Sequence, residues 1–373
     1  MGLTPTLPLT HPLPAPTLHE ARQLQFRLME CICAHFDGAQ LLSADVGVTP
    51  EIGRPLTTAR AENALAEFFG TEACALTQGA GTGAIRAMLM ATLAPGDPVI
   101  VHSGPPYDTT RTTFRALGLR LVEVDYNDPG ALGALPRQLD GTEHAYVQHP
   151  RHDLDDAYDP ATIIGQLRDA GLSVMTDENY TAFSVPRIGV ELGAAASAFS
   201  LFKLLGPEGV GCVVGTSKIV EQIHRDNYSG GGQVQGPQAL DALRSLVLVP
   251  VMWAIKAEVV EELTTRLESG EVPGVVGAAV MNAQDRMVTV LFEQPIARAV
   301  VAASARFGGQ NYPVGANSRY EIAPFVYRLS GANLEARPDL ADYAIRVNPV
   351  RAGADLVLSI LERSVEAALH DAD

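Results

Sequence analysis

The sequence predicts an α/β fold, in which helices sandwich a mostly parallel sheet, followed by a smaller C-terminal α+β domain. Three observations predict it. Short apolar runs alternate with helical segments between residues 57 and 215, as in chains that alternate strands with crossover helices. Hydrophobic residues make up 47% of the 373 residues, which is typical of a globular chain with a large core. After about residue 270 the pattern changes to strands such as RMVTVLF and YAIRVNPV, a helix from PIARAVVAASARF, a stretch rich in glycine, proline and asparagine, and a final helix.

The predicted elements follow one another in a regular order. TTARAENALAEFF predicts a helix, ACAL a short strand, GAIRAMLMATL a second helix and PVIVH a second strand. RLVEVD, HAYVQ, SVMTD and GCVVG continue the series of strands, and residues 235–268 read as mainly helical. RMVTVLF and YAIRVNPV predict strands of the smaller domain. We expect an N-terminal arm and helix over 1–45, a large domain over 46–250 and a small domain over 251–373.

Charge and cysteine content restrict the class of protein. The formal net charge is −16, which argues against nucleic acid or an anionic membrane as the main partner. Four cysteines do not form a disulfide framework, which favours a reducing, cytoplasmic location. The opening MGLTPTLPLTHPLPAPT has neither the basic region nor the continuous apolar run of a signal peptide. We expect it to be a proline-rich arm that lies over another part of the protein.

A glycine-rich turn follows the first predicted strand, in TQGAGTGAIRAML. Gly79, Ala80 and Gly81 precede a helix, so their backbone N–H groups and the helix dipole favour an anion, and Thr82 adds a hydroxyl. The spacing also fits the G-x-G-x-x-A form of a dinucleotide site, but the next strand ends at VHSG without the required acid. We favour a phosphate monoester, with a merely tight turn as the plainer alternative.

Two further features lie at the ends of later strands. Asp177 ends the strand SVMTD and Tyr180 follows in DENY, so Asp177 is either a capping acid or an acid that holds a cationic ring nitrogen. In the second case the Tyr180 hydroxyl would reach a ring oxygen. Lys203 follows 26 residues after Asp177, in the apolar run SLFKLLGPEGVG, and Ser200 stands three residues before it. Such a lysine either points to solvent or is held for its amine.

Together these features match what pyridoxal phosphate chemistry requires. The lysine amine must lose its proton to form a Schiff base. The acid keeps the pyridine nitrogen protonated, and backbone N–H groups with the hydroxyl of Ser200 bind the phosphate. We therefore predict pyridoxal 5'-phosphate as the cofactor and Lys203 as the catalytic residue.

The same motifs carry a resemblance to a known family. GTGAIR resembles the phosphate-binding loop, DENY the Asp-x-x-Tyr and SLFK the Ser-x-x-Lys of fold type I pyridoxal-phosphate enzymes, the aspartate aminotransferase superfamily. The resemblance runs from about residue 50 to the C-terminus and is closest to the YhfS-like group. It implies the fold type I architecture, an amino acid substrate and a homodimer that completes its sites with residues from both subunits.

Further site residues rest on the resemblance. PPYDTTR resembles the segment whose aromatic ring stacks on the cofactor in the cystathionine and methionine lyase branch, which implies that role for Tyr107. VQHPR resembles a Gln-x-x-Arg stretch of methionine γ-lyase-like proteins and implies that Gln148 lies near the ring oxygen. YAIRVNPVRAG implies that Arg346 grips the substrate α-carboxylate, for which a guanidinium is well shaped. Arg351 and Arg319 are alternatives.

The reaction class stays open between two alternatives. An aminotransferase is favoured, and a C–S lyase that performs β- or γ-elimination is the alternative. The first step does not distinguish them, because both reactions begin when Lys203 removes the α-proton. Aminotransferases place Asn-Pro where this chain has QHPR, and the lyases place threonine where it has Phe202. A metal-dependent hydrolase is a remote third reading. Its candidate ligands match no standard spacing, so we predict no metal; they are His144, His149, His152, Asp153, Asp155 and Asp156.

Two loops are candidates for the dimer contact. Arg54 precedes a predicted helix and would reach the phosphate of a neighbouring subunit, as the equivalent loop does in related enzymes. The polar glycine-rich stretch 228–232 is poor core material and would line its own pocket or reach a partner's site. Twofold dimers are also the commonest closed assembly.

Overall fold

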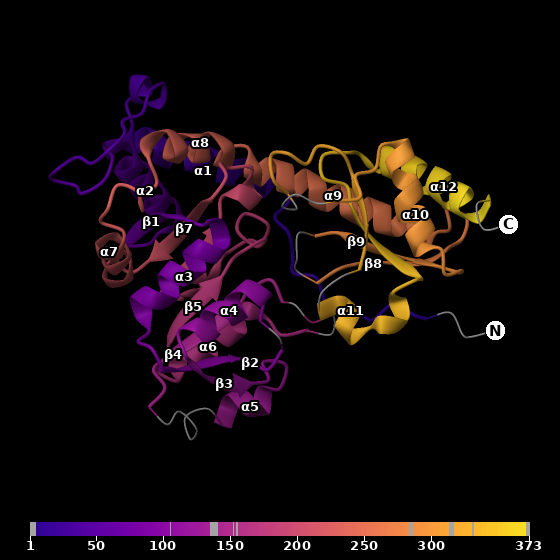
Figure 1. Cartoon of the computed structure of the whole chain (residues 1–373), viewed down its shortest axis with the longest axis horizontal. Coiled ribbons are helices and arrows are strands. Elements are labelled where there is room, and N and C mark those ends of the chain that lie inside the picture. Colours follow the sequence, from indigo (N-terminus) through magenta and orange to yellow (C-terminus); the bar gives the residue numbers. More distant parts are fainter. Residues whose placement is uncertain are drawn as a thin grey trace. The chain divides into compact units, whose positions relative to one another are not determined.

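The computed structural model describes residues 5–104, 106–134, 141–151, 153, 156–282, 286–312, 317–329 and 332–370. The chain divides into two compact units. The larger one comprises Pro16–Pro150 and Tyr158–Val251, and the smaller one comprises Met1–Ala15, Arg151–Ala157 and Met252–Asp373. Most of the larger unit is drawn from indigo to magenta in Figure 1, and most of the smaller one in orange and yellow.

In the described part of the larger unit, a seven-stranded sheet has the order β1-β7-β6-β5-β4-β2-β3. Strand β7 is antiparallel to both of its neighbours, β1 and β6, whereas the remaining pairs are parallel. The sheet is therefore mostly parallel, as the sequence predicts. Its strands are β1 (Ala73–Gln78), β2 (Pro98–His102), β3 (Arg120–Val124), β4 (His144–Gln148), β5 (Ser173–Asp177), β6 (Ala196–Ser200) and β7 (Val210–Gly215).

Helices cover both faces of this sheet. Helix α3 packs on β1, β6 and β7 with α7 beside it, and α2 packs between α1 and α8 (Figure 1). The helices are α1 (Leu18–His35), α2 (Leu56–Phe69), α3 (Ala80–Thr92), α4 (Asp108–Ala116), α5 (Pro129–Ala134), α6 (Pro160–Asp169), α7 (Ser217–Asp226) and α8 (Gly236–Leu246). Short 3-10 turns lie at Gly38–Leu41, Gly189–Leu192 and Phe202–Leu204.

The strands are apolar runs because each face has its own core. Tyr146 of β4 and Met175 of β5 join the cluster that includes side chains of α3 and α7. Their neighbours Val147 and Val174 point the other way, into the cluster that includes side chains of α6. Successive strand side chains alternate between faces, so a sheet covered on both sides requires apolar residues at consecutive positions.

The smaller unit holds an antiparallel sheet in the order β10-β11-β9-β8, and its main apolar cluster packs side chains of the sheet against helices. Its strands are β8 (Val275–Val280), β9 (Val288–Phe292), β10 (Phe325–Arg328) and β11 (Ala344–Asn348). Its helices are α9 (Val249–Glu268), whose first turn belongs to the larger unit, α10 (Ala297–Ser304), α11 (Ala332–Ala336) and α12 (Ala354–His370). Further 3-10 turns lie at Ala305–Phe307 and Pro338–Leu340.

The proline-rich arm is ordered against the smaller unit. The His11 N–H donates to Asn282 Oδ1 over 2.6 Å, and Arg286 Nη1 donates to the Leu13 carbonyl over 2.6 Å. Arg337 Nη2 donates to the Thr6 carbonyl over 2.8 Å. We expected the arm and first helix as one segment over 1–45, but α1 lies in the larger unit.

None of the helices formed by the described residues combines the length and the apolar character that crossing a membrane requires.

Candidate active site

The predicted residues of the larger unit gather where strands β4, β5 and β6 end. Gln148 and Asp177 are paired across the parallel strands β4 and β5, and Ser200 is the last residue of β6. The Tyr107 N–H donates to Gln148 Oε1 over 3.0 Å, which brings the start of α4 to the same edge. Parallel strands place their carboxyl ends at one edge, where ligands of such sheets bind.

The glycine-rich turn forms the start of α3. Gly79 and Ala80 have positive φ angles of 96° and 53°, and both their N–H groups donate to the Gly209 carbonyl, over 2.7 and 2.9 Å. The next two amides, those of Gly81 and Thr82, belong to the first helical turn, where N–H groups have no acceptor within the helix. These amides and the positive end of the helix dipole are suited to an anion.

Two glycines in this turn are required by close packing. A Cβ atom on Gly81 would lie 2.1 Å from the side-chain oxygen of Asn179, and one on Gly83 would lie 2.0 Å from the Gln78 carbonyl. Only glycine allows such approaches, so the turn is fixed against both the strand β1 and the segment that follows β5.

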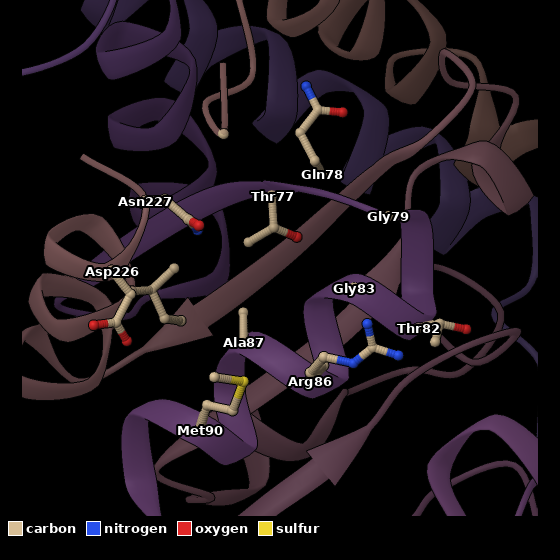
Figure 2. Close-up of a pocket in the computed structure, with 12 residues that line it drawn as sticks. Thr77, Gln78, Gly79, Thr82, Gly83, Arg86, Ala87, Met90, Asp226 and Asn227 are labelled. Atoms are coloured by element: carbon tan, nitrogen blue, oxygen red, sulfur yellow. The ribbon is translucent and has the colours of Figure 1, made fainter. Parts of the chain in front are cut away.

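A pocket of about 480 Å³ borders α3, and residues of β1 and α7 also line it (Figure 2). The Arg86 side chain reaches back along the helix toward Gly83 and Thr82, as Figure 2 shows. The pocket thus borders α3 on the side of Thr82 and Arg86, and its lining does not include Gly81, Asp177 or Lys203. The lining residues are Thr77, Gln78, Gly79, Thr82, Gly83, Arg86, Ala87, Met90, Ile223, Asp226, Asn227 and Gly232.

Asp177 is buried and held by three donors. Its Oδ1 accepts the N–H of Asn179 over 2.8 Å and the Asn179 side-chain amide over 2.7 Å, and its Oδ2 accepts the Tyr146 hydroxyl over 3.2 Å. Burial raises the pKa of Asp177 above its ordinary value, against the opposing effects of the Asn179 donors and the positive charge of Lys203. A cation placed beside Asp177 would therefore stabilise the carboxylate form.

Two residues of this network escaped the sequence analysis. Asn179 also accepts the Ser200 N–H on its Oδ1, over 3.1 Å, so it joins the acid, the end of β6 and the glycine turn. Tyr146 looks like an ordinary apolar strand residue. The available signals were weak: a buried tyrosine hydroxyl needs a hydrogen-bond partner, and Asn179 stands inside DENY.

Lys203 lies in the 3-10 turn Phe202–Leu204, directly after β6. Its N–H donates to Ser200 Oγ over 3.3 Å, which positions the turn. Its amine lies 3.8 Å from the centre of the Tyr180 ring and 5.6 Å from the centre of the Tyr107 ring. The amine is thus held over aromatic faces and close enough to Asp177 to affect its pKa.

Arg346 belongs to the smaller unit, on β11. Its guanidinium lies 4.5 Å from the centre of the Tyr327 ring, and its Nη2 donates to the Arg328 carbonyl over 3.3 Å. Arg351, the alternative, donates to the carbonyls of Glu321 and Ser318. The guanidinium of Arg351 therefore binds loop backbone.

Arg54 forms a tight pair inside its own chain. Its Nε donates to Glu62 Oε2 over 2.5 Å, and the Leu76 N–H donates to Glu62 Oε1 over 2.9 Å. Burial raises the pKa of Glu62 to about 7, although Arg54 and the Leu76 N–H oppose that effect. The loop before α2 is anchored by a buried carboxyl group.

The glycine-rich stretch 228–232 lies beside this loop. Gln233 Nε2 donates to the Gly53 carbonyl over 2.6 Å, and the Gly47 N–H donates to Gln235 Oε1 over 2.7 Å. Apolar side chains of both segments face outward: Leu42 is 81%, Val46 71% and Tyr228 79% exposed.

Two of the histidines considered as metal ligands, His144 and His149, lie at the start of β4 and directly after its end. The buried His149 Nδ1 lies 2.8 Å from Glu178 Oε2, and His144 is the first residue of β4. His152 and Asp155 lie outside the described residues.

The donor set at this edge suits pyridoxal phosphate. It offers an amine at Lys203, a buried carboxylate at Asp177, and a helix start whose Gly81 and Thr82 amides have no acceptor within the helix. The close approaches at Gly81 and Gly83 hold this turn against Asn179 and the Gln78 carbonyl.

Comparison with known proteins identifies the class. Residues 47–246 match the aminotransferase class I and II family, so the chain belongs to that family and is a pyridoxal-phosphate-dependent enzyme of fold type I. Residues 261–361 match the YhfS-like C-terminal domain. The chain is 47% identical over 359 residues to the uncharacterized protein YhfS of Escherichia coli strain K12, covering 95% of this chain and 99% of that one. It therefore belongs to the YhfS-like proteins.

Solved structures agree with this assignment. The crystal structure of the pyridoxal-5'-phosphate dependent protein YhfS from Escherichia coli matches with a TM-score of 0.93 and 47% identity, over 96% of this chain and 99% of that chain. Cystathione gamma lyase CalE6 of Micromonospora echinospora matches with a TM-score of 0.73 over 92% of this chain and 99% of that one. At 16% identity, the second match shows the shared fold alone.

Proposed function

We propose that the protein is an aminotransferase that acts on an α-amino acid, with Lys203 as the residue that binds the cofactor covalently and moves the α-proton. The observation that carries the proposal is the Lys203 amine, which lies 3.8 Å from the Tyr180 ring and close to the buried Asp177. The match to the class I and II aminotransferase family favours amino transfer.

Each residue has a distinct task in this proposal. Bound pyridoxal phosphate supplies an electron-accepting ring that stabilises the negative charge left when the α-proton departs. Asp177 would hold the proton on the ring nitrogen, Tyr107 would cover one face of the ring, and Tyr180 and Gln148 would bind near the ring oxygen. Lys203 Nζ takes and returns the α-proton. The amides of Gly81 and Thr82 and the Ser200 hydroxyl would bind the phosphate. We also expected the amides of Gly79 and Ala80 there, but both N–H groups donate to the Gly209 carbonyl, so these two residues shape the turn instead.

Elimination at a C–S bond is the second candidate, and the place of Tyr107 favours it. Its ring lies 5.6 Å from Lys203 Nζ, where the resemblance to the cystathionine and methionine lyase branch implies a stacking aromatic residue. Both reactions use the same proton transfer, and they differ in whether the carbanion is reprotonated at the cofactor or expels a leaving group.

A panel of amino acids separates the two reactions. Purified holoenzyme is incubated with each amino acid, with and without an acceptor 2-oxo acid, and the products are quantified. Amino transfer converts the acceptor into a new amino acid and releases no ammonia. Elimination needs no acceptor and releases ammonia, a 2-oxo acid and a thiol. Release of ammonia and thiol without amino transfer would replace the proposal by the lyase.

Asp177→Asn should slow α-proton exchange about 100-fold, the usual cost of losing one preorganised electrostatic contact. The asparagine oxygen can still accept the two Asn179 donors while its amide faces the Tyr146 hydroxyl, so the fold should be preserved. Exchange of the α-proton with deuterated solvent measures the effect, and thermal unfolding checks the fold. Wild-type exchange in a cofactor-loaded variant would remove this role from Asp177.

We also propose a homodimer whose sites are shared between subunits. The outward-facing Leu42, Val46 and Tyr228 lie on the two joined segments described above, and Arg54 lies on one of them. Such exposed apolar side chains are suited to an interface between copies. Sedimentation at micromolar concentration tests the stoichiometry, and a fully active monomer would contradict it.

Subunit mixing tests whether Arg54 acts on the partner's site. An inactive Lys203→Ala chain mixed with an inactive Arg54→Ala chain should regain part of the activity, because one hybrid site then carries neither lesion. Arg54→Ala leaves the buried Glu62 without its ion pair, so Arg54→Ala combined with Glu62→Gln is the matched chain. If folded dimers exchange subunits and stay inactive, Arg54 has no role across the interface.

A further inference from the structure

His149 and Glu178 are brought together by the register of the sheet. They directly follow Gln148 and Asp177, which are paired across β4 and β5. The His149 N–H donates to the Asp177 carbonyl over 3.1 Å, and His149 Nδ1 lies 2.8 Å from Glu178 Oε2. The two side chains are 4% and 0% exposed. A buried pair of titratable groups thus adjoins Asp177, the acid of the proposed site.

The Glu178 carboxylate is satisfied on both oxygens. Oε1 accepts the Gly189 N–H over 2.8 Å, and Oε2 accepts the Thr181 hydroxyl over 2.6 Å in addition to facing His149. Burial raises the pKa of Glu178, but His149 and the hydroxyls of Thr181 and Thr176 more than offset that effect, so its pKa lies below the ordinary value. Glu178 is therefore a buried carboxylate.

The backbone of Glu178 joins the turn 178–182 to β6. The Glu178 N–H donates to the Ala198 carbonyl over 2.8 Å, and its carbonyl accepts the N–H groups of Thr181 and Ala182, each over 3.1 Å. The side chain of the same residue binds the Thr181 hydroxyl. Both the backbone and the side chain of Glu178 are therefore bonded to the turn 178–182.

Tyr180 is the strained residue of that turn. Its φ angle is 75°, a left-handed conformation that bulky residues rarely adopt and that persists only where the surroundings enforce it. This conformation sets the ring 3.8 Å from Lys203 Nζ. Glu178 links His149 to this turn, because its Oε2 accepts the Thr181 hydroxyl and lies 2.8 Å from His149 Nδ1.

Glu178 disfavours the charged form of the neighbouring Asp177, an effect that a purely structural role does not require. A second carboxylate next to Asp177 raises the pKa of Asp177 further. Buried pairs of polar or charged side chains are often no more stabilising than apolar residues of the same volume. The placement of Glu178 is therefore better explained by what it orients than by the stability it adds.

We propose that His149 and Glu178 form a positioning pair that fixes the turn 178–182, so that Tyr180 is held against the Lys203 amine. The inference rests on the proposed function, because it assigns the pair to the site in which Lys203 and Asp177 act. Neither residue touches the reacting atoms. Both act through Tyr180 and the backbone of Asp177.

A pH titration of visible absorbance tests the pair in cofactor-loaded protein. Glu178→Gln, His149→Asn and the double variant should each move the midpoint of the band of lysine-bound cofactor by about half a pH unit or more, in one direction. The double variant should move it no further than the larger single change, because either loss releases the same turn. Thr181→Ser should keep the wild-type midpoint, since it keeps the hydroxyl.

Glu191→Gln is the matched control, because Glu191 is a nearby, partly buried acid that binds the Ile188 N–H instead of the turn. It should leave the midpoint unchanged.

Single variants that move the midpoint in opposite directions would show an effect of charge alone and overturn the proposal. Folded variants with lower unfolding temperatures and a wild-type midpoint would overturn it as well. A wild-type protein without this absorbance band would instead refute the proposed role of Lys203. Other titratable groups around the pair are Asp159, Asp177, Glu191 and Tyr146.

Discussion

Lys203→Ala should abolish covalent attachment of the cofactor and lower turnover by about four orders of magnitude or more. The reason is geometric. Lys203 Nζ lies over the Tyr180 ring and beside Asp177, and the alanine side chain can neither bind the cofactor covalently nor move a proton at that position. Borohydride reduction followed by mass analysis of the intact chain measures the attachment, and steady-state kinetics measure turnover.

Two further variants make the result specific. Lys203→Arg keeps a positive charge over the Tyr180 ring but stays protonated, so it should retain the fold and still fail to attach the cofactor. Lys218→Ala removes an exposed lysine on α7 and should behave as wild type. Borohydride fixation on the Lys203→Ala chain to the wild-type extent would assign the covalent role to another residue.

Much of the fold could be predicted because apolar runs determine it. The strands that end at Gln148, Asp177 and Ser200 are short apolar segments between helices, and their chemistry-bearing residues stand at the carboxyl ends. The order of the strands along the chain therefore predicted which side chains meet at the carboxyl ends of the sheet. The stretch 235–268 was expected as one mainly helical segment, and it forms two helices, α8 and α9.

What could not be predicted depends on side-chain geometry and on strand direction. The run GCVVG looks like its neighbours, yet β7 is antiparallel to both strands that flank it. Nothing in the sequence DENY distinguishes Asn179. Its role appears only in the structure, where its side-chain amide donates to Asp177 and its side-chain oxygen accepts the Ser200 N–H. The left-handed conformation of Tyr180 is likewise invisible in the sequence, because it results from the contacts of its neighbours.

Arg346→Ala should lower kcat/KM for amino acids roughly 30- to 5,000-fold, because the substrate carboxylate would lose its proposed charged, two-pronged partner. This factor corresponds to a loss of about 2 to 5 kcal/mol of transition-state stabilisation. The guanidinium is stacked 4.5 Å from the Tyr327 ring and tied to the Arg328 carbonyl, so it is preorganised on β11. Visible absorbance of the bound cofactor should not change. Arg346→Lys should recover only part of the loss, because an ammonium cannot reproduce the planar fork.

The sharpest test of Arg346 compares each amino acid with its decarboxylated amine. The wild-type enzyme should prefer the amino acid, and Arg346→Ala should lose that preference while its slow reaction with the amine stays the same. Arg298→Ala, which removes an exposed arginine of the same unit, should keep the wild-type preference. If Arg346→Ala retained the full preference, the carboxylate would be bound elsewhere, and the same comparison on Arg351→Ala and Arg319→Ala would decide between the two remaining candidates.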